Sequence, residues 1–401
     1  MKTKTIFPIA LLVVAGILDP RAGFSQDSVS PGPDGRNVSL KLEVERAIAK
    51  GVRFLKTQQS AETGAWGDSE IPAFSALAIS AILGDPAVEA GKALPEEVEK
   101  GYEFLLSNVK PDGGIYGKGL ATYNTSLSVM ALLRSGKEEH LPVIAKARRL
   151  LINQQQDYDK KGQNDNLFDG GIGYGGTYAH SDLSNTHLAL EALYYSKKVL
   201  ADTAFDESSE FDLDWDAAIE FVSLTQNSAE TAKRLGPSVI VREEDKGGFV
   251  YFPGDTKSDE IVLDTAEGKK TALRSYGSMS YAGLLSFIYA DLDRNDPRVA
   301  AVMDWLQKNF TLEENPGMDA QGLYYYYHTM SKALAITGTK NIVTAEGKKI
   351  DWKEKLSIKL MSTQQQDGSW MNNTSNRWME DNPVLVTAYS LLALQHAYGQ
   401  L

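Results

Sequence analysis

One repeated unit constrains the fold of this chain more than any single motif does. Each copy is predicted to contain an amphipathic helix ending in glutamine or asparagine, a loop of glycine and aromatic residues, and a second, more apolar helix. In the first copy the helices span 44–58 and 74–83 around the loop 64–67; in the last they span 352–365 and 384–397 around the loop 367–370. The unit occurs six times, which predicts one repeat-built structure.

The copies between these two keep the helix pair and vary the loop. Three loops are glycine-rich, at 112–116, 169–174 and 246–249, and the fifth copy is degenerate around Gly317 and Gly322. When the second helices are aligned by their small and apolar residues, six side chains share one register: Ser75, Thr125, Thr186, Tyr281, Tyr327 and Thr387. The longest interval between them contains residues 236–273, which are rich in Val, Ile, Phe, Asp and Lys and predict an inserted β-hairpin.

Twelve helices of alternating character have a natural packing. The six apolar helices form an inner ring, because a helix that is apolar on nearly all sides must be buried, and the six amphipathic helices cover it. We therefore predict an all-α fold, an α6/α6 toroid over residues 42–401 with the hairpin inserted. The alternative is an open solenoid, which needs capping repeats at its ends, whereas a closed ring does not.

The last loop carries the residues that suggest a family. Residues 364–370 read QQQDGSW, which resembles the QW repeat of squalene-hopene cyclases and related terpene cyclases. The same loop-helix unit is similar to that of protein prenyltransferase β-subunits. The resemblance covers roughly 42–398, with one strong copy and four weaker ones. It implies a toroid with its site in a central cavity, but fold alone does not assign the chemistry.

Neither family's chemistry is complete here. Triterpene cyclases that protonate an alkene carry D-x-D-D-T at the start of an inner helix, and the matching residues 182–186 read DLSNT. Asp182 is kept, but Ser184 stands where the resemblance places the proton donor. The acidic run 212–216 lies at the start of an outer helix and predicts capping. Prenyltransferases hold zinc with Asp, Cys and His, and the chain has no cysteine, so no metal or cofactor is predicted.

The N-terminus predicts export. Lys2 and Lys4 precede an apolar run at 6–18 that has the length of a signal-peptide core, with small residues for cleavage near Ser25. An uncleaved anchor is the alternative. Residues 26–41 are then expected to form a flexible segment, and cleavage changes the net charge from −12 to −14. This charge argues against a nucleic-acid partner. No later segment is expected to cross a bilayer, and peripheral membrane association stays open.

Polar residues on the inner helices are candidates for a site. One position after the shared register, copies three and five carry His187 and His328, and five positions after it they carry Glu191 and Lys332. A charge within an apolar helix is costly unless it is paired or faces a wet cavity. These residues are therefore either acid–base groups lining the cavity or an ion pair with hydrogen bonds between helices.

Carboxylates and aromatic residues complete the candidates. Asp182 and Asp381 lie at the rim of the inner ring and join the two histidines and Glu191 as catalytic candidates. Aromatic faces stabilise cations and stack on sugars, and four tyrosines open the fifth inner helix. The predicted substrate-binding residues are Tyr324, Tyr325, Tyr327, Thr125, Thr186, Tyr281 and Thr387. The oxygen-rich loop 157–169 is expected to be a solvated turn rather than a calcium site.

Three functions fit these residues, and the sequence does not decide whether the protein is an enzyme. The first is an exported terpene cyclase-like enzyme acting on an isoprenoid-like substrate, with Asp182, His187 and Tyr327 in acid–base and cation-stabilising roles. The second is a carbohydrate-active lyase or hydrolase with paired carboxylates. The third is a non-catalytic binding or scaffold toroid. The expected partner is a small apolar molecule or a glycan in the central cavity.

Overall fold

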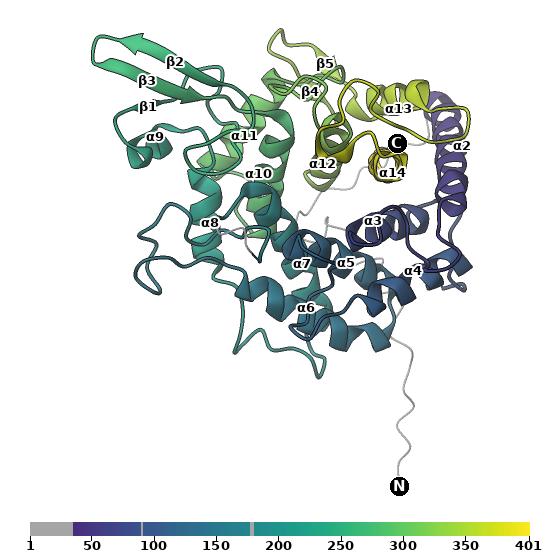
Figure 1. Cartoon of the computed structure of the whole chain (residues 1–401). Coiled ribbons are helices and arrows are strands. Elements are labelled where there is room, and N and C mark those ends of the chain that lie inside the picture. The colour runs from purple at the N-terminus through teal and green to yellow at the C-terminus, as the bar shows by residue number, and fades with distance from the viewer. Residues whose placement is uncertain (1–34, 90, 177–179) are drawn as a thin grey trace.

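The helices form a closed double ring (Figure 1). The structure is a computed structural model that describes residues 35–89, 91–176 and 180–401. The inner ring consists of α3 (Pro72–Leu83), α5 (Ala121–Ser135), α7 (Leu183–Leu200), α10 (Gly277–Tyr289), α12 (Leu323–Ile336) and α14 (Pro383–Tyr398). Each of these helices packs against the next, and α14 packs against α3. The predicted all-α toroid is confirmed, and the open solenoid is not formed.

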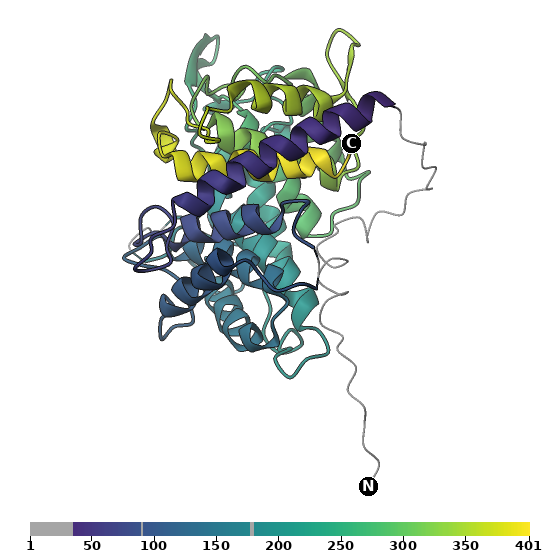
Figure 2. The ribbon, with the colours of Figure 1, turned by 90° about the vertical axis from the view of Figure 1, so that its right-hand side faces the viewer.

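The outer ring covers the inner one. It consists of α2 (Gly35–Thr57), α4 (Glu96–Ser107), α6 (Leu141–Asn153), α8 (Trp215–Leu224), α11 (Pro297–Lys308) and α13 (Trp352–Thr363), with the 3₁₀ turn η2 (Glu138–His140) leading into α6. Figure 2 shows α2 lying across α14 and beside α13, so the first helix packs on the last pair. α2 begins at Gly35, ahead of the toroid boundary at residue 42 that the sequence indicated.

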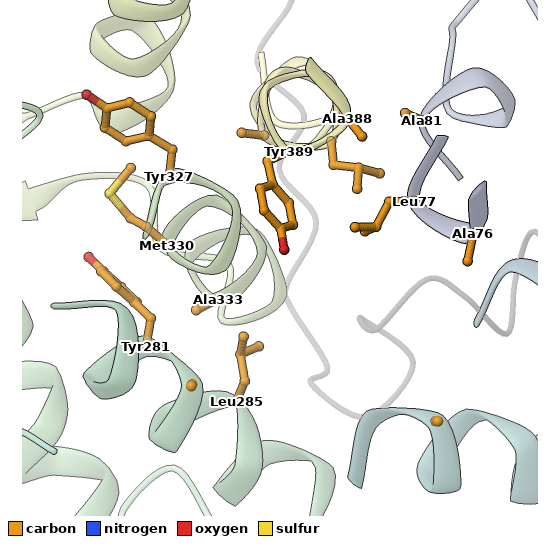
Figure 3. Packing of buried hydrophobic residues seen from close by; sticks show 14 of the residues in the cluster. Ala76, Leu77, Ala81, Tyr281, Leu285, Tyr327, Met330, Ala333, Ala388 and Tyr389 are labelled. Atoms are coloured by element: carbon orange, nitrogen blue, oxygen red, sulfur yellow. The ribbon is translucent and has the colours of Figure 1, made fainter. Parts of the chain in front are cut away.

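The two rings differ in apolar patterning as predicted. Every residue of α3 from Pro72 to Ile82 is buried, whereas α4 buries one face through Val98, Tyr102 and Leu105 and carries glutamates in its first turn. Figure 3 shows part of the resulting core: Leu77 and Tyr389 extend toward the space that the inner helices enclose, while Tyr327 leaves the other side of α12, beside Met330. The central space is therefore lined by some inner-helix residues and not by others of the same helices.

Hydroxyl groups at the shared register hold the loops. The backbone N–H of the residue two positions after the first loop glycine donates to a buried Ser or Thr Oγ on the following inner helix. The pairs are Trp66 with Ser75 at 2.9 Å, Ile115 with Thr125 at 3.0 Å, Ile172 with Thr186 at 2.9 Å and Trp370 with Thr387 at 3.0 Å. In the fourth copy Phe249 donates to Ser280 at 3.0 Å, so Ser280, not Tyr281, is the equivalent residue.

In four of the copies a glutamine joins the loop to the next outer helix. The Gln59 side-chain amide donates to Gly64 O and to Glu97 O, both at 2.8 Å. Gln155 and Gln226 repeat this pattern, and Gln364 donates to Gly368 O and to Ala47 O of α2, both at 3.0 Å. The last copy is therefore joined to the first by the same bonds that join its neighbours.

The predicted hairpin lies between α8 and α10. It consists of β2 (Glu260–Thr265) and β3 (Gly268–Leu273), which are antiparallel with Thr265 opposite Gly268, and β1 (Val239–Ile240) pairs parallel with β3. The remaining elements are α9 (Ala229–Leu235), the antiparallel pair β4 (Ile342–Val343) and β5 (Lys349–Ile350), and the 3₁₀ turn η3 (Arg377–Met379). Among the described residues, no helix has the length and apolarity to cross a membrane. The predicted signal peptide at 1–25 lies outside them.

Candidate functional site

Within the part of the inner ring that the structure describes, one cavity lies toward the loop end of the helices and another toward their C-terminal end. The loop-end pocket, of about 160 Å³, is lined by Leu120, Tyr123, Tyr174, Ser184, Tyr251, Tyr276, Ser278, Met279, Tyr325, Trp378, Met379, Glu380 and Tyr389. The charged cavity, of about 390 Å³, is lined by the middle and C-terminal parts of α3, α5, α7, α12 and α14. Its ionisable groups besides Tyr195 are Arg134, Glu191, His328, Lys332 and His396. The two cavities share no lining residue, so the sequence candidates divide between two places.

Aromatic rings form most of the wall of the loop-end pocket. Tyr325 packs on Tyr389 with their ring centroids 5.7 Å apart, and the Tyr389 and Tyr123 hydroxyls lie 3.3 Å apart. Figure 3 shows Tyr389 reaching into the enclosed space from α14. Such faces stabilise cations and accept apolar groups. Of the tyrosine run that the sequence singled out, Tyr325 lines this pocket.

Three lining residues hold backbone conformations that L-residues rarely adopt. Leu120, Trp378 and Met379 have φ of 53°, 56° and 61°, in the left-handed region that costs a non-glycine residue roughly 1–2 kcal/mol. Trp378 is 42 % and Met379 40 % exposed, so two large apolar side chains are held at the mouth of the pocket instead of in the core. Backbone strain is frequent at functional sites, so these three residues make the pocket a candidate site.

Asp182 lies beside the loop-end pocket, at the N-terminus of α7. It is fully buried and forms the N-cap of the helix, where Oδ1 accepts from Asn185 N and Oδ2 from Asn185 Nδ2, both at 2.8 Å. Burial raises the pKa of this carboxyl to about 6, against the opposing effect of its hydrogen bonds. Ser184, not Asp182, lines the pocket. Asp182 therefore positions the start of α7.

The buried carboxyl in the pocket wall is Glu380, a residue that the sequence analysis missed in favour of Asp381. Asp381 is exposed, whereas Glu380 is 1 % exposed. Glu380 Oε1 accepts from Tyr324 N and Tyr325 N at 2.9 Å, and Oε2 from Asn372 Nδ2 at 2.8 Å. Burial raises the pKa of Glu380 despite these bonds. Glu380 belongs to the last repeat, whereas the first turn of α12 that it caps belongs to the repeat before. No local sequence pattern predicts a cap between repeats.

Glu191 and Lys332 form a buried ion pair across the ring. Lys332 Nζ lies 2.8 Å and 2.9 Å from the two Glu191 carboxylate oxygens. The Lys332 side chain is 14 % exposed and the Glu191 side chain 5 % exposed. Burial acts to raise the pKa of Glu191, but the Lys332 ammonium holds it below its usual range. Five of the six positions five after the register line the charged cavity: Ser80, Met130, Glu191, Lys332 and Leu392. The register thus locates the face of the helices that lines this cavity.

Two buried histidines lie near this ion pair, and each stacks on the ring of a tyrosine. His187 stacks on Tyr289 with ring centroids 6.1 Å apart, and burial lowers its pKa to about 4. His328 lines the charged cavity, stacks on Tyr389 at 5.6 Å, and has a pKa that burial lowers well below its ordinary value. Both imidazoles are neutral near pH 7. Of the catalytic candidates, Glu191 and His328 line the charged cavity, whereas Asp182, His187 and Asp381 line neither cavity. The candidates therefore do not form one group.

Most predicted substrate-binding residues have other partners. Thr125, Thr186 and Thr387 are fully buried and accept the loop N–H groups described above. Tyr327 donates to Leu312 O at 2.5 Å, and Tyr281 packs on Tyr326 with centroids 5.8 Å apart. Tyr324 is buried near Thr363. Of the predicted substrate-binding residues, Tyr325 lines the loop-end pocket, and the others lie outside both cavity linings.

The acidic sequences have structural roles. Asp214 caps α8 by accepting from Ala217 N at 2.9 Å, and Asp212 pairs with Arg148 and Lys197. In the loop 157–169, Asp169 accepts from Tyr158 N at 2.7 Å and Asn166 N at 2.8 Å. No group of three or more His, Asp or Glu within the described ranges is arranged to hold a metal ion.

Comparison with known proteins shows the fold. No protein-family model matches the chain. Among solved structures, the chain is similar to a variant of the type II terpene cyclase MstE from Scytonema bound to its substrate geranylgeranyl dihydroxybenzoate, with TM-score 0.52, 13 % identity, and coverage of 91 % of this chain and 100 % of that one. Ligand-free MstE gives the same TM-score and identity, with coverage of 90 % of this chain and 99 % of that one. The fold is therefore a terpene cyclase-like α/α toroid.

Proposed function

We propose that this protein is exported and binds a chain of isoprene units in the loop-end pocket. The proposal rests on one observation: a pocket walled by tyrosine, methionine and leucine side chains has two exposed apolar side chains, Trp378 and Met379, fixed at its mouth by strained backbone. Apolar and aromatic walls favour an apolar ligand. MstE, which has the same fold, takes a geranylgeranyl substrate.

The size of the pocket limits how much of the ligand it encloses. Its volume of about 160 Å³ lies below the ~300–1,000 Å³ typical of sites that enclose a whole ligand. The pocket therefore holds the end of an isoprenoid chain, and the rest of the chain lies against Trp378 and Met379.

The residues support binding better than acid-initiated cyclisation. Ser184 faces the pocket where the resemblance places the proton donor, and a serine hydroxyl is too weak an acid to protonate an alkene. Glu380 accepts three N–H groups, an arrangement that suits a helix cap. The carbohydrate-active alternative needs two carboxyl groups facing one space, and neither Asp182 nor Asp381 lines the pocket.

Farnesol binding to the mature chain tests this proposal. Titration of residues 26–401 with farnesol, followed by tyrosine and tryptophan fluorescence, is expected to show saturable binding. Trp378→Ala is expected to weaken it roughly 10-fold, about 1.4 kcal/mol, because the mouth loses its largest apolar wall. Ile358→Ala is the matched control, since Ile358 is also exposed, at 46 %, but lies on the outer helix α13.

Two results would contradict the proposal. One is equal farnesol affinity in Trp378→Ala and wild type. The other is conversion of farnesol or squalene to product by the wild type but not by Glu380→Gln, which would make the protein an acid catalyst. The export part is tested separately: after expression with the complete leader, the mature N-terminus is expected near residue 26, and retention of Met1 would contradict export.

A further inference from the structure

The charged cavity has the size and lining of a second ligand site. Its volume of about 390 Å³ falls within the range of small-molecule pockets. One part of its wall is apolar, formed by Leu77, Leu127 and Leu392, and another part carries Arg134 and His396. None of these residues lines the loop-end pocket, so the charged cavity is a separate place from the proposed isoprenoid site.

Arg134 is a cation in this cavity that has no partner within the part of the chain that the structure describes. It lies in the last turn of α5, half-buried, and it makes no hydrogen bond or ion pair with any described residue. Glu191 attracts it only from a distance, because both Glu191 carboxylate oxygens bind Lys332. A guanidinium partly removed from water without an anion is costly to a fold, and its fixed fork of N–H donors matches a carboxylate.

Neutral donors accompany Arg134. His328 Nδ1 and His396 Nε2 are buried and have no hydrogen-bond partner among the described residues, and their rings lie 5.8 Å apart. Burial lowers the pKa of His396 to about 3 and that of His328 well below its ordinary value, so each ring carries one N–H at neutral pH. With Lys332 neutralised by Glu191, the cavity keeps one excess positive charge, on Arg134.

We infer that the charged cavity binds a small amphipathic carboxylate. The carboxylate lies on the Arg134 guanidinium with the histidines as further donors, and the alkyl tail lies against Leu77, Leu127 and Leu392. A purely structural role for Arg134 is the competing explanation, because cations are stabilised at helix C-termini. In that case replacing Arg134 changes stability and leaves binding unchanged.

Calorimetric titration with sodium octanoate at pH 7 separates these explanations. Octanoate is expected to bind the wild type, and Arg134→Gln to weaken binding at least 10-fold while circular dichroism stays unchanged. Arg53→Gln, which removes an exposed arginine from α2, is the matched control and is expected to bind like the wild type. Octanol, with the same tail and no charge, is expected to bind at least 10-fold more weakly.

Four results would overturn the inference. They are no octanoate binding by the folded wild type, equal affinity in Arg134→Gln, equal affinity for octanol, and binding of inorganic phosphate as tight as that of octanoate. If Arg134→Gln does not fold, Arg134→Lys, which keeps the charge and loses the fork, replaces it with an expected loss of at least 3-fold, and an unchanged affinity overturns the inference. Trp378→Ala is expected to bind octanoate normally, which keeps this test separate from that of the loop-end pocket.

Discussion

Buried histidines on the inner ring make the stability of this protein depend on pH. Burial lowers the pKa of His187 to about 4 and of His396 to about 3, from 6.5 in an exposed side chain. The unfolded chain therefore binds more protons than the folded one below pH 6.5, and the stability present above that pH is lost as the pH falls toward 4. Asp182 acts in the opposite sense, because its pKa is raised.

The substitution His187→Phe isolates one of these titrations. Phenylalanine keeps a ring against Tyr289 and removes a nitrogen, Nδ1, that has no partner among the described residues. We expect the loss of unfolding free energy between about pH 6.5 and 4 to become shallower by up to about 1.4 kcal/mol per pH unit. Urea unfolding of both proteins at several pH values measures this slope. The difference at pH 8, where His187 is neutral in the folded and the unfolded chain, reports effects other than its titration, and equal slopes would contradict the assigned burial effect.

At the scale of elements, glycine sets how closely each loop approaches the next outer helix. A Cβ on Gly64 would lie 2.6 Å from Lys100 O of α4, and Gly113, Gly170, Gly247 and Gly368 have the same relation to the outer helix that follows each of them. All five have positive φ. Two requirements therefore favour glycine at this position of the repeat. The backbone has a positive φ, and the neighbouring carbonyl oxygen leaves no room for a Cβ.

A pair of alanine substitutions separates these two requirements. Gly64 and Gly162 have φ of 74° and 76°, but a Cβ on Gly162 meets nothing within 4 Å. Gly162→Ala is expected to cost roughly 1–2 kcal/mol from backbone strain alone. Gly64→Ala is expected to cost at least about 1–3 kcal/mol more, from overpacking against backbone. Equal shifts of the urea midpoint in the two variants would show that the contact with Lys100 O adds nothing.

At the scale of the whole molecule, the fold was predictable from sequence and the sites were only partly so. The repeats predict a ring because every copy must bury the same face of its helices. Thr125 and its equivalents mark the register, and their hydroxyl groups bind the loops. The pocket depends on residues that act across repeats: Glu380 caps α12 from the loop before α14, and Trp378 adopts a backbone that no sequence pattern predicts. The register located Glu191 and Lys332 on the cavity face but could not show that Arg134 has no hydrogen-bond or ion-pair partner among the described residues.

Ring closure predicts that contacts between the chain ends are as important as those inside the ring. Gly51 of α2 lies against Leu391 and Trp370, where an added Cβ would be 2.8 Å from each. Gly101 of α4 is the equivalent residue one repeat later, where a Cβ would lie 2.6 Å from Trp66 and 2.9 Å from Ile79. Either glycine replaced by alanine gains up to about 1 kcal/mol of helix propensity and loses about 1–3 kcal/mol by overpacking.

We therefore expect Gly51→Ala and Gly101→Ala to lower the free energy of unfolding by similar amounts, in one cooperative urea transition followed by both circular dichroism and fluorescence. In a linear array, a contact made by the first helix affects only the end repeats, so Gly51→Ala would produce a separate early transition or almost no change. Gln364 and Gln395 also bridge the two ends, through Ala47 O and Ala81 O. Their bonds make the two ends of the chain one interface, and loss of that interface is expected to unfold the whole ring.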